Sequence, residues 1–266
     1  MGIFNKSIIK IVKMKNKIHT KGKYVYLLIA FILIWIVFYE FILSSNFILP
    51  RPYFVILSLG DLLANYNIIN NVLSTVSAIY FTIITTFIVM WSFRIYLVNG
   101  HNIVRHTVAA LGWFAGFIPS ILIAIFLIYW LGGSEYVKYI FGFFTCFTLF
   151  FIKVEDETGK LGNEYIDAAA SLGADNKMIA GKIRWKAIEP ALAGYVPEIH
   201  LYLWSMIIII EYIKGGYGLG VVFRTALLYR DLPVLFSSAI ITLIMIFAGE
   251  SLMKYFRNKY FSRSAY

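Results

Sequence analysis

The sequence between two long apolar runs reads EYIDAAASLGADNKMIAGKIRWKAIEP from Glu164 to Pro190. Its first part combines good helix formers with early acidic residues, and Gly173 is a typical residue at the end of a helix. Asp175 is suited to cap a second helix, which we expect to end at Pro190. The stretch therefore predicts two short helices joined at a glycine.

Two short helices between membrane spans are typical of a docking element rather than of a catalytic site. The small side chains of Ala168, Ala169 and Ala170 allow the surface of another protein to approach closely. Charged residues on either side can fix the register of such a contact. The sequence therefore predicts a protein partner for this segment.

The chain as a whole is strongly apolar. Of its 266 residues, 60% are hydrophobic and 14% are charged, whereas soluble domains have about 45–50% apolar and about 25% charged residues. A soluble domain could not bury so much apolar surface, so most of the chain must lie in lipid. This composition excludes a secreted disulfide scaffold, a disordered chain and an ordinary cytosolic enzyme. The sole cysteine, Cys146, lies in an apolar run, where we expect it to be buried.

The apolar runs predict an all-α membrane protein with six transmembrane helices, because a helix of about 20 apolar residues crosses the hydrocarbon core. The fourth run has only 14 uncharged residues, and we expect the Lys138 side chain to extend outward and lengthen that span. The expected spans are Tyr24–Ser45, a span within Leu62–Phe93 whose apolar part begins near Ile68, Thr107–Leu131, the run between Lys138 and Lys153, Ala191–Ile210, and Leu232–Met253.

The positions of the basic residues predict the orientation of the chain. With a cytoplasmic N-terminus, 19 of the 24 Lys and Arg residues fall on the cytoplasmic side, as the positive-inside rule requires. The other five are Arg51, Lys138, Lys214, Arg224 and Arg230. Both termini are then cytoplasmic, and the net charge of +10 indicates contact with lipid rather than nucleic acid.

We divide the chain into a basic segment (1–23), a transmembrane domain (24–256) that includes the polar loop (154–190), and a tail (257–266).

The polar loop resembles a known motif. Asp167, Ala168 and Ala169, followed by Gly173 and Ile183, resemble the EAA motif of inner-membrane permease subunits in binding-protein-dependent ABC importers. The wider pattern is similar to the nitrate/sulfonate/taurine type. Further matching positions are Pro119, Trp204, Glu211, Gly218 and Gly220.

The resemblance implies a type I importer-like permease with cytoplasmic coupling helices between spans four and five. It assigns contact with the ATPase to Glu164, Asp167, Ala168, Ala169, Gly173, Ile183 and Pro190, and a place on the pathway or outer gate to Pro119, Trp204, Glu211, Gly218 and Gly220.

The resemblance also implies partners. A dimer of cytoplasmic ATPase subunits would bind ATP and Mg²⁺, because this sequence has no G-x-x-x-x-G-K-[ST] phosphate loop and needs no cofactor of its own. An extracytoplasmic binding protein would deliver a small solute, such as nitrate or an organic anion like a sulfonate or taurine. Two copies of the chain would form a homodimer in the inner (cytoplasmic) membrane.

Several alternatives remain open in the sequence. Glu211 fits either an outer gate or an interfacial charge paired with Lys214 or Arg224, and Glu198 and His200 fall near the cytoplasmic end of the fifth span, where solvent can reach them. Gly112 and Gly116 have the spacing that allows close helix packing.

Two other functions compete with the importer. An ion-coupled secondary transporter or channel would need carboxylates embedded in the membrane, and a membrane enzyme would need clustered Asp, His or Cys residues. The four His residues show no metal-binding spacing.

Overall fold

The computed structural model describes residues 26–27, 29–42, 49–99, 103–162 and 164–261, and every regular element in those ranges is a helix. In chain order the helices are η1 (Val37–Ile42), α2 (Pro52–Ala64), α3 (Ile68–Val98), α4 (Ile103–Gly116), α5 (Ser120–Trp130), α6 (Tyr136–Gly159), α7 (Glu164–Ser171), α8 (Asn176–Met178), η2 (Ile179–Arg184), α9 (Trp185–Lys214), α10 (Leu219–Leu228) and α11 (Leu232–Phe261).

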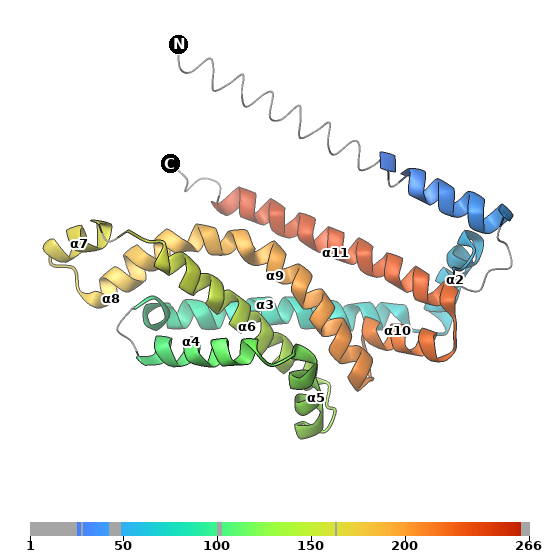
Figure 1. Ribbon diagram of the computed structural model, residues 1–266, viewed down its shortest axis with the longest axis horizontal. Coiled ribbons are helices and arrows are strands. Elements are labelled where there is room, and N and C mark those ends of the chain that lie inside the picture. The colour runs from blue at the N-terminus through green and yellow to red at the C-terminus, as the bar shows by residue number, and fades with distance from the viewer. Residues whose placement is uncertain (1–25, 28, 43–48, 100–102, 163, 262–266) are drawn as a thin grey trace, which may run out of the picture.

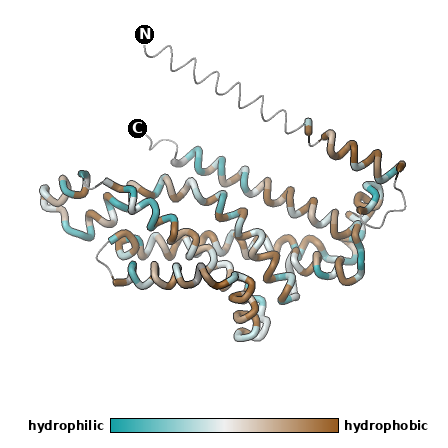
Figure 2. Tube along the Cα trace, viewed as in Figure 1, coloured by the Kyte–Doolittle hydropathy of each residue, from teal (hydrophilic) through white to brown (hydrophobic). Residues whose placement is uncertain are grey.

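The long helices extend along one direction, with α7 and α8 at one end and α2 and α10 at the other (Figure 1). The bodies of these helices are largely hydrophobic, whereas the end that carries α7 and α8 is more hydrophilic (Figure 2). Four helices in the described ranges are long and apolar enough to cross a membrane: Ile68–Val98, Tyr136–Gly159, Asn176–Lys214 and Leu232–Lys259. The chain is therefore a helical membrane protein.

The first expected span, 24–45, falls partly outside the described residues. Its described part, Ile29–Ile42, is a short apolar helix. The basic segment 1–23 lies outside the described residues altogether.

The single helix expected over 107–131 is wrong, because the structure divides this region into α4 and α5. The break falls at Pro119, which has φ −53° and ψ 128° and precedes the first residue of α5. Proline has no backbone N–H to donate and disfavours helical geometry in the residue before it. The α5 helix consequently leaves the direction of the long helices (Figure 1).

Pro190 does not end a helix, contrary to our expectation. The helix continues through Pro190 and Pro197, so that Asn176–Lys214 is one continuous run of 39 residues. Each proline costs the helix a backbone hydrogen bond. The side chains of Trp185, Ile188 and Leu192 are buried in the core around Pro190, and this packing offsets the loss.

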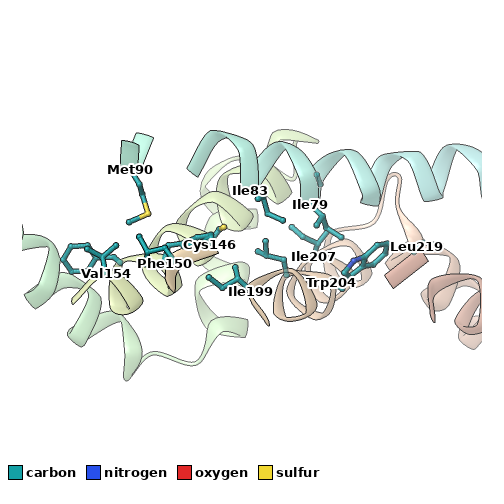
Figure 3. Close-up of a cluster of buried hydrophobic side chains, with 14 of the residues drawn as sticks. Ile79, Ile83, Met90, Cys146, Phe150, Val154, Ile199, Trp204, Ile207 and Leu219 are labelled. Atoms are coloured by element: carbon teal, nitrogen blue, oxygen red, sulfur yellow. The ribbon is translucent and has the colours of Figure 1, made fainter. Parts of the chain in front are cut away.

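The core lies where α3, α6 and α9 pack together (Figure 3). Its members include Ile79 and Ile83 from α3, Phe150 from α6, and Ile199 and Ile207 from α9. The expected burial of Cys146 is confirmed, since its exposed fraction is 0%.

Gly142 lies at a close approach of these helices. A Cβ atom there would lie 2.7 Å from Thr82 Oγ1 and 3.0 Å from Ile207 Cδ1. At Gly112, which the sequence suggested as a packing glycine, no described atom lies within 4 Å of the Cβ position. Of these two glycines, Gly142 is therefore the one that packs closely against other helices of this chain.

We expect Gly142→Val to destabilise the chain by about 1–3 kcal/mol, the usual cost of overpacking a core. Gly112→Val is the matched control, because it adds the same side chain to another apolar helix where space is open. Thermal unfolding in detergent should show a lower Tm for Gly142→Val alone. Equal Tm values for the two variants would contradict the assigned helix crossing.

Candidate functional site

The turn between α7 and α8 is formed as the sequence indicates. The Gly173 N–H donates to Ala170 O and the Ala174 N–H donates to Ala169 O, both at 3.0 Å. Gly173 has φ +85°, which favours glycine. The next helix begins at a cap in which Asp175 Oδ1 accepts a hydrogen bond of 2.7 Å from the Met178 N–H. Two local motifs thus set the angle between α7 and α8.

The outer surface of this turn is exposed with respect to the residues that the structure describes. Glu164, Asp167 and Ala168 are exposed, and no described atom lies within 4 Å of a Cβ at Gly173. Leu172 is 89% exposed at the tip of the turn, although leucine is normally buried. We refer to residues 164–178 as the docking end, because its exposed surface combines small, charged and apolar groups.

The residues that follow the docking end attach it to the rest of the molecule. Ile179 and Ala180 are buried, and a Cβ at Gly181 would lie 3.3 Å from Ile95 on α3. The Arg184 guanidinium donates to Val98 O at the end of α3, at 3.0 Å. Ile183 and Pro190 are both half-buried in this region.

A second polar cluster lies at the opposite end, around Glu211. Its carboxylate and the Lys138 ammonium group are 3.4 Å apart, and both side chains are only 1% exposed. The Thr75 hydroxyl and the Gly220 N–H donate to Glu211 Oε2 at 2.7 and 3.2 Å. Lys138 also donates to Ser74 Oγ and, at 3.0 Å, to Tyr217 O. The buried charges are therefore paired and hydrogen-bonded, as burial requires.

The loop of residues 215–220, which we call the glycine loop, is fixed to this cluster by helix α3. The Gly218 N–H donates to Asn71 Oδ1 and the Leu219 N–H donates to Thr75 Oγ1, both at 2.8 Å. A Cβ at Gly218 would lie 2.0 Å from Glu211 Cδ, and one at Gly220 would lie 2.2 Å from Ile208 O. Both positions therefore require glycine, since any side chain would displace the polar cluster or the backbone of α9.

The part of the chain that carries both the docking end and Glu211 matches a known family. Residues 98–262 match the family model for the binding-protein-dependent transport system inner membrane component. The chain belongs to this family. It is thus a permease component of an ABC importer, a transport protein rather than an enzyme. A comparison with curated proteins gives no significant match.

The ion pairing of this permease differs from what the sequence suggested. Lys138 does not extend outward but turns inward, because the buried Glu211 carboxylate offers it a partner. Lys214, which we considered as the partner of Glu211, instead pairs with Glu135 at 2.7 Å. Burial opposes ionisation of Glu135, yet the hydrogen bond from Lys214 and the nearby Lys138 charge lower the pKa of its carboxyl below the ordinary value.

The remaining candidate residues lie apart from these two clusters. Trp204 is buried in the core and its indole N–H donates to His200 Nε2 at 2.9 Å. His200 is fully buried, so the expectation that solvent reaches it is wrong; the helix begins well before 191 and places His200 deep in the bundle. Glu198 is exposed and lies 3.5 Å from Lys153. Pro119 is exposed at the break between α4 and α5.

Sequence reasoning missed the α3 residues that hold Glu211 and the glycine loop: Thr75 donates to Glu211, and Asn71 accepts from the Gly218 N–H. Asn71 and Thr75 are four residues apart and so share a face of α3, but nothing in the sequence joins that face to a loop far along the chain. No group of three His, Cys, Asp or Glu side chains suited to a metal ion occurs among the residues that the structure describes.

We expect Glu211→Met to destabilise the permease by about 3–5 kcal/mol, because it leaves the buried Lys138 ammonium with only the half-exposed Glu135 carboxylate, 3.5 Å away, as a partner. Lys138→Met should have a comparable effect for the same reason. The double variant should recover much of the loss, because it buries no unpaired charge. Thermal unfolding of the four proteins in detergent measures the coupling, and a double variant whose loss equals the sum of the single losses would contradict it.

Proposed function

We propose that this permease transmits the free energy of ATP hydrolysis from a separate cytoplasmic ATPase to a solute path through the membrane. It acts as a type I importer subunit with six spans and both termini in the cytoplasm. Two copies pair as a homodimer in the inner membrane, and two ATPase subunits bind ATP and Mg²⁺. The distribution of Lys and Arg supports this orientation, because the docking end then lies on the basic, cytoplasmic side.

The observation that carries the proposal is the exposed docking end. It projects beyond the apolar bodies of the long helices (Figures 1 and 2). The Ala168 side chain is small and exposed, and Leu172 presents an apolar group to solvent. Burial of this exposed leucine against a partner protein would remove apolar surface from water and favour association. The EAA-like residues Asp167, Ala168 and Gly173 therefore act as the coupling motif.

The continuous helix Asn176–Lys214 supports transmission from this end to the other. At a rise of 1.5 Å per residue its 39 residues extend over about 58 Å. Displacement of the docking end by ATPase closure would therefore move Glu211 and the glycine loop as well. This loop lies on the side where a binding protein delivers its solute. By resemblance, the solute is a small organic anion such as a sulfonate or taurine, or nitrate.

We expect Gly173→Trp to reduce the amount of ATPase subunit that co-purifies with the tagged permease by at least about tenfold, a loss of about 1.4 kcal/mol in binding. Gly133→Trp is the matched control. Gly133 has φ +68° and open space around its Cβ position, so it shares the backbone strain and the added bulk with Gly173. It precedes α6, at the end of that helix opposite the docking end.

Leu172→Asp tests the same surface without backbone strain and should also reduce co-purification. Membrane insertion and thermal stability should stay unchanged in both docking-end variants. Full recovery of ATPase with Gly173→Trp and Leu172→Asp would reject the docking end as the coupling element. Equal losses with Gly133→Trp would reject it as well.

A further inference from the structure

Helices α3 and α6 border an open hollow beside the buried ion pair. Its volume is about 590 Å³, and its lining includes Asn70, Ser74, Ser77, Glu135, Lys138 and Tyr139. The Ser77 hydroxyl and the Tyr139 phenol are 3.0 Å apart across the hollow. A surface that faces lipid would not place an ammonium group, a carboxylate, an amide and several hydroxyls around one hollow.

A second, smaller hollow follows along the same two helices. It has a volume of about 270 Å³ and shares Tyr139 with the first. Its lining is mostly aromatic, with Phe81, Phe143 and Phe144, and includes the hydroxyl-bearing Thr85. The Phe81 and Tyr139 rings pack edge to face with centroids 5.5 Å apart. The two hollows adjoin at Tyr139, and we call them together the groove: a polar part beside the ion pair and a mostly aromatic part that follows.

Helix α3 has three distinct faces, and one of them lines this groove. The groove face carries Asn70, Ser74, Ser77, Phe81 and Thr85, which are spaced by three or four residues and therefore align. Ile69 and Ile84 line neither hollow; both are exposed and apolar beside this face, as contact with lipid requires. The third face is buried in the core and includes Ile79 and Ile83.

We propose that the groove between α3 and α6 lines the path of the solute. The outer hollow receives a small polar solute, because its lining offers hydrogen-bond donors and acceptors and both signs of charge. Phe81, Tyr139 and Phe143 form the narrow section that follows. Thr85 lies on this path and faces water, whereas Ile84, at nearly the same depth, faces lipid. This inference rests on the proposed transport function. It assigns the solute path to residues other than those that the sequence suggested for the pathway or outer gate.

Cysteine labelling tests the groove directly. Ser77→Cys, Thr85→Cys and Ile84→Cys are each made in a Cys146→Ala background, because Cys146 is the chain's sole native cysteine. The full chain, purified with its associated subunits and placed in lipid nanodiscs, is exposed to a charged methanethiosulfonate reagent with and without ATP and vanadate. This reagent reaches both ends of the protein but does not enter lipid.

We expect Thr85→Cys to react at least about tenfold faster than Ile84→Cys in one or both nucleotide states, because only a hydrated thiol ionises readily. Ser77→Cys should react as a hydrated position in the outer hollow. Labelling after denaturation in detergent normalises the three variants. Slow reaction at Thr85 in both states, or equal rates at Thr85 and Ile84, would overturn the proposal.

Failure of this inference can be told apart from failure of the proposed function. Reactive Thr85 in a chain that recovers no ATPase would keep the hydrated groove and reject ATP coupling. Unreactive Thr85 in a chain that recovers an ATPase would keep the importer and reject this path.

Discussion

The continuous helix from Asn176 to Lys214 constrains the rest of the structure, because both functional ends are attached to it. In lipid, a helix must satisfy its backbone hydrogen bonds internally, so it is far stiffer than a loop. The chain retains this helix through Pro190 and Pro197 by burying large side chains next to them. Under the proposed function, a movement imposed at the docking end would be conveyed along the helix axis instead of being absorbed at a joint.

The second constraint is the low dielectric environment around Lys138 and Glu211. A buried ion pair contributes little net stability, but removing one partner is expensive, so the pair sets the arrangement of its neighbours. It joins α6 to α9. The Thr75 hydroxyl and the Gly220 N–H donate to Glu211, and the Gly218 N–H donates to Asn71, so α3 and the glycine loop join the same cluster. The end of the molecule opposite the docking end is therefore one polar unit, and the groove between α3 and α6 opens directly beside it.

Local patterns allowed part of this structure to be predicted. Three predictions depended on a few neighbouring residues each: the all-helical fold class, the helix end at Gly173 and the helix cap at Asp175. The structure contains all three. The continuous helix could not be inferred, because the local effect of Pro190 is outweighed by packing with distant helices. The partner of Glu211 was missed for a similar reason: Lys138 is 73 residues away in sequence, and Lys214 and Arg224 were nearer. The EAA-like motif and the family match together indicate transport, although the motif alone does not reveal Leu172 at the tip of the turn.

The rigidity of the long helix is the central claim, and a spin-label distance measures it most directly. Labels at Met178 and Tyr212, both exposed on this helix, should be about 50 Å apart at 1.5 Å per residue. With one labelled copy per assembly, the account predicts the same narrow distance distribution in nucleotide-free and vanadate-trapped transporter. A distribution that shortens or broadens when nucleotide is trapped would show that the helix bends at its prolines, and would contradict transmission along its axis.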